Sequence, residues 1–119
     1  MQYLLLIYNN ELAAPDPASP EMAAAFKDYG AFTESIRKSG HYKGGNALQS
    51  VATATSVRVR DGKTLLTDGP FAETAEQLGG YYLIEAADLD DATAIAARIP
   101  GARWGTIEVR PIWAMAASA

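Results

Sequence analysis

Apolar residues along the chain predict two strands that are apolar on both faces. Residues 3–8 and 80–86 each form a short continuous run that is rich in aromatic and branched side chains. Runs of this length favour a strand over a helix, and the lack of alternation with polar positions indicates burial on both faces. The sheet that contains these strands is therefore expected to be covered on both sides.

Two other segments alternate apolar and polar positions, which is typical of a strand with one solvated face. Valines alternate with arginines in residues 53–60, and residues 106–113 alternate in the same way. The Asp-Gly pair at positions 61 and 62 is a strong hairpin signal. Residues 64–67 are therefore expected to return antiparallel to residues 53–60.

Two stretches have the periodicity of amphipathic helices. The first is expected over residues 20–39, with Ser19 as N-cap and Gly40 as the C-terminal cap residue. Its predicted apolar side consists of Met22, Phe26, Tyr29, Phe32, Thr33 and Ile36. The second helix is expected to follow Asp88 as N-cap and to end at Pro100.

These elements follow one another in the order β-α-β-β-β-α-β, in a single domain of residues 1–119. Residues 41–51 could hold a short or bulged strand, and residues 114–119 are expected to fray. The order contains the β-α-β-β-α-β plan of the ferredoxin-like fold, with one added β-hairpin. The predicted class is therefore α+β, with two helices on one face of an antiparallel sheet.

The second face of such a sheet would be an exposed apolar patch. Patches of this kind usually mark an interface. A symmetric homodimer with two sheets packed face to face would cover it. The alternative is a monomer whose second face is solvated.

Composition excludes several classes of protein. The chain has 119 residues, a net charge of -4 and no cysteine. A mildly acidic chain lacks the basic patch of a nucleic-acid binder, and it has no polybasic segment for an anionic membrane. Without cysteine there are no disulfides or thiolate ligands. The apolar run at the start is too short to cross a bilayer, so a cytoplasmic location is expected.

The central segment carries a family resemblance. DGPFAETAEQLGGYYLIE, residues 68–85, resembles the signature of the DGPF proteins within the YCII-related family. MQYLLLIY at the start, VRVRDGKTLLTDGPF and IEVRPI extend the resemblance over nearly the whole chain. It implies a ferredoxin-like fold that dimerises as an α+β barrel, with no assigned reaction. Some similar proteins are encoded beside extracytoplasmic-function sigma factors, which implies a regulatory role as an alternative.

The wider YCII group has been proposed to use a His-Asp pair. Its histidine lies in the first helix, and its aspartate stands just before a proline at the end of the second. Here Tyr29 lies near the first place, and Ile99 stands before Pro100 at the second. The pair is therefore not transferred to this chain, and Asp68 is the obvious substitute for acid–base chemistry.

Asp68 has a structural and a functional interpretation. Because it precedes Gly69-Pro70, its carboxylate can accept backbone hydrogen bonds within a turn. At a strand end facing a cleft, a buried carboxylate could instead have a raised pKa and act as a general base.

Tyrosines and arginines on the strands are the candidate ligand-binding residues. Tyr81 and Tyr82 point to opposite faces of one strand, so that one packs under a helix and the other faces a dimer cleft. Arg58 and Arg110 could clamp an anionic ligand, although solvation or pairing with a neighbouring glutamate explains such strand arginines equally well.

No cofactor or metal is predicted. Glu73 and Glu76 lack a nearby histidine, and the single histidine, His41, is expected to be a capping or surface residue. Two functions remain open. The first is a dimeric enzyme or binding protein, with a small molecule between the sheet and the partner subunit. The second is a non-catalytic regulatory or interaction module.

Overall fold

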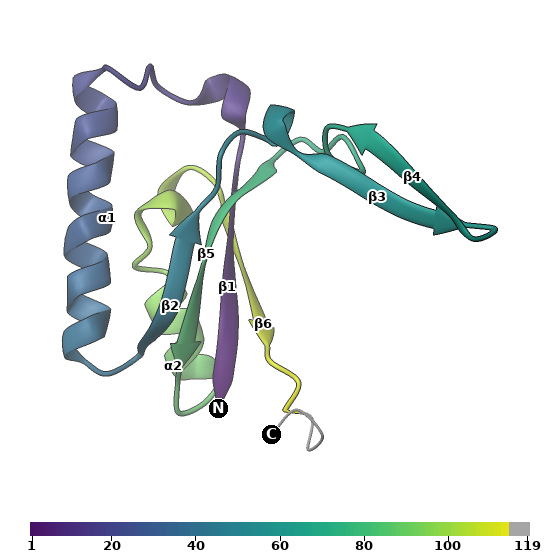
Figure 1. Cartoon of the computed structure of the whole chain (residues 1–119). Coiled ribbons are helices and arrows are strands. Elements are labelled where there is room, and N and C mark those ends of the chain that lie inside the picture. The colour runs from purple at the N-terminus through teal and green to yellow at the C-terminus, as the bar shows by residue number, and fades with distance from the viewer. Residues whose placement is uncertain (115–119) are drawn as a thin grey trace.

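A computed structural model describes residues 1–114 of the chain (Figure 1). In chain order the elements are β1 (Gln2–Asn9), η1 (Glu11–Ala13), α1 (Pro20–Lys38), β2 (Tyr42–Ala47), η2 (Val51–Thr53), β3 (Thr55–Arg60), β4 (Lys63–Asp68), β5 (Gln77–Glu85), α2 (Leu89–Ala96), η3 (Pro100–Arg103) and β6 (Thr106–Pro111). The α+β class is confirmed. Four strands, β2 to β5, lie between α1 and α2, one more than in the predicted order β-α-β-β-β-α-β. Apart from Ala114, the predicted frayed tail lies outside the described residues.

Four strands form one antiparallel sheet in the order β2-β5-β1-β6. Residues that stand opposite each other in the register share a face, and neighbours in sequence point to opposite faces. Tyr3 is paired with Ile84, and Leu4 is paired with Leu83 and Arg110. The sheet therefore has two different faces, one containing Tyr3 and the other containing Leu4.

The face that contains Tyr3 holds the core. Both helices cover it, and the buried cluster joins Tyr3, Leu5, Ile7, Tyr82 and Ile84 of the sheet with Phe32, Ile36, Ala92, Ile95, Ala96 and Ile99. The other face, called the open face below, presents Leu4, Leu6, Tyr8, Tyr81 and Leu83, all of them partly exposed in the single chain. The prediction that the central strands are apolar on both faces is confirmed.

The helix boundaries follow the predicted caps. The Ser19 hydroxyl accepts a hydrogen bond from the Met22 N–H at 3.2 Å, and the Asp88 carboxylate accepts one from the Asp91 N–H at 2.8 Å. Gly40 ends α1 with a φ of 83°, in the left-handed region that glycine adopts without strain. Local side-chain chemistry therefore sets where the helices begin and where α1 ends.

The hairpin of β3 and β4, called the arm below (residues 55–68), does not join the four-stranded sheet. It extends from the end of the sheet to the side opposite α1 (Figure 1). Asp61 and Gly62 both have positive φ, 52° and 73°, as the predicted two-residue turn requires. The prediction that residues 53–60 form a half-buried strand is wrong for the single chain, because Val57 and Val59 are each 60% exposed.

The apolar runs that predict two-sided strands lie on β1 and β5. Within residues 1–114, no helix combines the length and the apolar character needed to cross a membrane.

Candidate functional site

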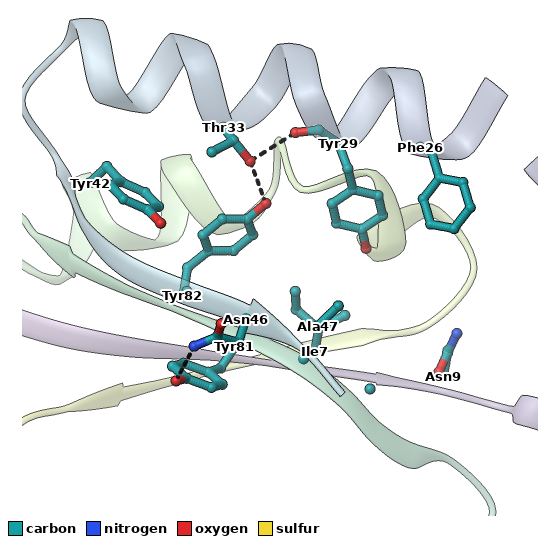
Figure 2. Close-up of a pocket in the computed structure, with 13 residues that line it drawn as sticks. Ile7, Asn9, Phe26, Tyr29, Thr33, Tyr42, Asn46, Ala47, Tyr81 and Tyr82 are labelled. Carbon is teal, nitrogen blue, oxygen red and sulfur yellow. Dashed lines mark hydrogen bonds between the residues drawn. The ribbon is translucent and has the colours of Figure 1, made fainter. Parts of the chain in front are cut away.

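A cavity of about 380 Å³ opens between α1 and the core side of the sheet, next to β2 and β5 (Figure 2). Phe26, Tyr29, Tyr42 and Tyr82 supply its aromatic wall. None of the lining residues that the structure describes carries a formal charge. Small-molecule sites are typically apolar clefts of about 300–1,000 Å³ with a few polar groups, so this cavity has the size and lining of one.

The cavity exists because only the C-terminal half of α1 packs against the sheet. Phe32 and Ile36 are 6% and 0% exposed, whereas Phe26, two turns earlier, is 67% exposed. The predicted apolar side of the helix is therefore buried in its C-terminal half, whereas in the N-terminal half its side chains border the cavity or solvent.

Two hydrogen bonds at Thr33 connect the Tyr82 hydroxyl of the sheet to the backbone carbonyl of Tyr29 in α1. The Thr33 hydroxyl donates to the Tyr29 carbonyl at 2.9 Å, and it lies 2.7 Å from the Tyr82 hydroxyl. Because Thr33 has one hydroxyl hydrogen, the Tyr82 O–H donates to Thr33 Oγ1. The Tyr82 oxygen keeps its lone pairs, so it can accept a hydrogen bond from a ligand.

Tyr29 is anchored at its far end. Its hydroxyl oxygen accepts a hydrogen bond from the Gly101 N–H at 3.1 Å. A side chain at position 101 would not fit, because a Cβ there would stand 2.5 Å from the Tyr29 hydroxyl. Since the oxygen accepts this bond, the Tyr29 O–H remains available as a donor.

Burial keeps both phenols neutral. Desolvation raises the pKa of Tyr29 above its ordinary value of 10.0, against the opposing effect of the Gly101 hydrogen bond. Desolvation likewise raises the pKa of Tyr82, and the Thr33 hydrogen bond acts in the opposite direction. Neither tyrosine can serve as a phenolate base near pH 7. Near neutral pH the cavity therefore presents these two side chains as uncharged hydroxyl groups.

Glycines in β2 allow the Tyr82 ring to lie on the sheet. A Cβ at Gly45 would stand 2.9 Å from both the Tyr81 carbonyl oxygen and the Tyr82 ring. The ring also meets Phe32 edge to face, with centroids 5.2 Å apart. Of the two glycines at positions 44 and 45, Gly45 is therefore the one that the packing of this wall requires.

The structure places the predicted site residues in different regions. Tyr82 faces the cavity from the core side, while the Tyr81 hydroxyl accepts a hydrogen bond from Asn46 Nδ2 at 2.8 Å on the open face (Figure 2). Arg110 pairs with Glu108 through its Nε at 2.8 Å. Arg58 and Asp68 lie on the arm, and Asp68 is exposed. The single chain brings neither arginine nor Asp68 to the cavity.

Thr33 and Phe26 are functional candidates that the sequence pattern misassigned. Both fall on the helical apolar stripe, which predicts packing for each. A threonine at such a position can also bond back to the carbonyl four residues earlier, and Thr33 does so. Thr33 is the one polar residue on the predicted apolar side of the helix, and this was the signal in the sequence that could have identified it.

A second cluster joins the end of α1 to the start of α2. His41 Nδ1 lies 2.7 Å from Ser39 Oγ, and His41 Nε2 lies 3.2 Å from Asp91 Oδ2. A hydrolytic triad also needs free N–H groups for an oxyanion. Here the Gly40 and His41 N–H groups already donate to carbonyls of α1. The cluster therefore links two helices, and the His41 side chain is a bridge between them, a contact that the prediction of a capping or surface residue did not include.

Asp91 makes the stability of this link depend on pH. Its pKa is lowered, first by the hydrogen bond from the Ala87 N–H and then by His41. A carboxylate with a lower pKa in the folded state stabilises the protein above its unfolded pKa, and this contribution is lost as the pH falls through the folded pKa. We therefore expect Asp91→Asn to reduce the fall in melting temperature between about pH 5 and pH 3.

Thermal denaturation followed by circular dichroism across that range measures the effect. Asp90→Asn is the matched control, since it removes a carboxylate from the same first turn of α2. Equal pH dependence in wild type and Asp91→Asn would contradict the linkage.

Comparison with known proteins gives consistent matches over nearly the full length. A family model described as the YCII-related domain matches residues 1–116. An uncharacterized protein of Rhizobium meliloti (strain 1021) is 35% identical over 114 residues, which cover 94% of this chain and 92% of that protein.

Proposed function

The chain belongs to the YCII-related family, and from the lining of the cavity between α1 and the sheet we propose that it binds a small, neutral, largely aromatic molecule there. The uncharged aromatic cavity bordered by the Tyr82–Thr33 hydrogen bond is the observation that carries the proposal. A planar apolar ligand would lie against the aromatic rings. The Tyr82 oxygen would accept a hydrogen bond from it, and the Tyr29 hydroxyl would donate one.

Binding is favoured over acid–base catalysis at this cavity. Tyr29, which lies near the place of the family's proposed histidine, accepts a hydrogen bond from the Gly101 N–H, two residues after Ile99. Ile99 is 1% exposed within the core, and Tyr29 is neutral. A neutral phenol can donate a hydrogen bond or a proton, but it cannot act as a general base at neutral pH. A role for Asp68, Arg58 or Arg110 would require a second subunit.

We further propose that the strands and helices form a ferredoxin-like arrangement, and that two copies pair through their open faces as a dimeric α+β barrel. The strand order and the helices on one face support the first statement. The partly exposed apolar side chains of the open face support the second, because a pairing across a two-fold axis would bury both copies of that face at once.

A non-catalytic regulatory module, connected to sigma-factor signalling, is the second candidate. The exposed arm favours it, because an uncovered hairpin with apolar side chains is a surface for another protein. The two functions differ in whether the cavity takes a ligand.

The first experiment is a titration with neutral aromatic probes, indole and 2-naphthol, followed by two-dimensional NMR. We expect shifts at the amides of Gly45, Gly80 and Tyr82, which line the cavity. Ala47 lies at the cavity edge on the core side, so Ala47→Phe should fill the cavity and abolish these shifts. Thr33→Val should weaken binding about tenfold, because it removes the hydrogen-bond partner of Tyr82.

Leu83→Ala is the control for adsorption to apolar surface, since Leu83 lies on the open face. It should leave the titration unchanged. Shifts restricted to open-face amides, or unchanged binding by Ala47→Phe, would reject the cavity as the site and leave the regulatory module as the better proposal.

A further inference from the structure

One end of the cavity carries a polar side chain that is separate from the tyrosines. Asn9 lies at the end of β1 and belongs to the cavity lining. Figure 2 shows it below Phe26, with its side chain rising from the strand toward α1. Asn9 is only partly buried and Phe26 is 67% exposed, so this end of the cavity is open to solvent. A ligand that enters here passes between an apolar ring and an amide.

The amide of Asn9 differs from the amides on either side of it. Asn10 accepts a hydrogen bond from the backbone N–H two residues later, at 3.0 Å. Gln77, opposite Asn9 in the register, donates to one backbone carbonyl and accepts from another backbone N–H. Within residues 1–114, no protein group hydrogen bonds to the Asn9 amide. Its oxygen and its nitrogen are therefore both left for a ligand or for water.

A bulge in β5 makes room for this amide. The register of β1 with β5 shifts after Ile7, so that Gly79 is an extra residue in β5. A Cβ at position 79 would stand 3.3 Å from Asn9 Oδ1, which is tighter than an ordinary contact. Bulges are frequent beside functional sites, where they redirect a side chain. The floor next to Asn9 is thus bare backbone, against which a flat molecule can lie.

The register along β1 sets the spacing of the polar groups in the cavity. Tyr82 is paired with Leu5. The Tyr29 hydroxyl and the Ile7 side chain lie beside the same glycine of η3. Alternate residues of a strand lie about 6.6 Å apart, so the levels of Tyr82, Tyr29 and Asn9 along β1 span about 13 Å. An elongated molecule is therefore needed to reach the amide and the tyrosines together.

An amide recognises a different partner from a phenol. The asparagine side chain has an acceptor oxygen and a donor nitrogen side by side. Its best partner is an edge that offers a donor and an acceptor on neighbouring atoms, as in the paired contacts of asparagine with adenine. The described lining carries no formal charge, which favours a neutral edge over an ion because an unpaired charge is costly to bury.

We propose that Asn9 is a specificity-determining residue of the cavity and selects flat aromatic molecules with a donor and an acceptor on neighbouring atoms of one edge. Aromatic amides, lactams and amino-substituted nitrogen heterocycles belong to this class. The aromatic body lies between Phe26 and the backbone of β5, and a polar group at its far end meets the tyrosines. The inference rests on the proposed function and adds which neutral molecules the cavity prefers.

The first test compares two ligands of similar shape. The amide edge of 6-hydroxy-2-naphthamide offers Asn9 a donor and an acceptor, whereas the ester edge of methyl 6-hydroxy-2-naphthoate offers acceptors alone. NMR titrations followed at the amides of Gly45, Gly80 and Tyr82 give the two dissociation constants. We expect Asn9→Leu to lower the preference for the amide over the ester about tenfold relative to wild type. Gln49→Leu, which removes an exposed amide outside the cavity lining, is the matched control and should keep the preference.

A specificity switch provides the second measurement. Asn9→Asp replaces the amide by a carboxylate, which accepts hydrogen bonds but does not donate them at neutral pH. It should bind 6-hydroxy-2-naphthamidine, a cation of similar shape, about tenfold more tightly than wild type does, and this gain should shrink at high salt. A variant that only damages the fold would weaken every ligand, and circular dichroism checks folding.

The outcomes separate this inference from the proposed function. A lower amide preference in Asn9→Leu together with the amidine gain in Asn9→Asp supports it. If both ligands bind in the cavity and Asn9→Leu changes their ratio no more than Gln49→Leu does, the cavity remains a binding site and the role of Asn9 is rejected. If no probe shifts the cavity amides, the binding function is rejected and this inference with it.

Discussion

Ile84→Ala is expected to lower the free energy of unfolding by about 3 kcal/mol. Ile84 is 0% exposed in the central strand β5, facing the helices from between Tyr3 and Tyr42 in the register. Shortening it removes buried methyl groups and leaves a cavity that the flanking tyrosines cannot fill by a small movement. Urea denaturation followed by circular dichroism, at several protein concentrations, measures this loss.

Leu83→Ala is the informative control because Leu83 is the next residue of the same strand and points to the open face. Its effect is expected to appear in self-association and in concentration-dependent stability. The loss in Ile84→Ala should persist at the lowest concentration. Equal, concentration-independent losses in both variants would contradict the assignment of one face to the core and the other to the interface.

Leu6→Asp is expected to convert the proposed dimer to a folded monomer. Leu6 lies in the middle of the open face, opposite Tyr81 and Glu108. Pairing two open faces would bury an unpaired carboxylate close to an existing glutamate. An uncompensated buried charge costs about 3 kcal/mol or more, which weakens association by at least about 100-fold.

Sedimentation velocity of wild type and variant measures this loss. Ala94→Asp is the control, since it adds the same charge to an exposed position of α2, away from the open face. It should not change the sedimentation. A wild-type protein that is monomeric at high concentration, or a Leu6→Asp variant that associates as the wild type does, would reject pairing through this face.

Features with local causes were predictable from sequence. The helix caps at Ser19 and Asp88 depend on one side chain and the N–H groups of the next turn. The Asp61-Gly62 turn depends on two residues that tolerate positive φ. Alternation along a strand placed Tyr81 and Tyr82 on opposite faces, and the structure confirms it. The α+β class follows from such local signals.

The candidate site depended on contacts between distant parts of the chain. Thr33 and Tyr82 are 49 residues apart, and Tyr29 and Gly101 are 72 apart. Periodicity placed Phe26 and Phe32 on one helical stripe, but only the packing of α1 left Phe26 outside and opened the cavity.

Asp68 is a second residue whose surroundings could not be predicted from the sequence. Its place at the end of a strand was predictable from the sequence, and its distance from the cavity was not. β3 and β4 pair only with each other, and this pairing carries Asp68 onto the exposed arm. By itself the sequence determined the strands, helices and turns, because their causes lie within a few neighbouring residues. Only the tertiary structure decided which side chains share a cavity and which remain uncovered, because those outcomes depend on how separate elements meet.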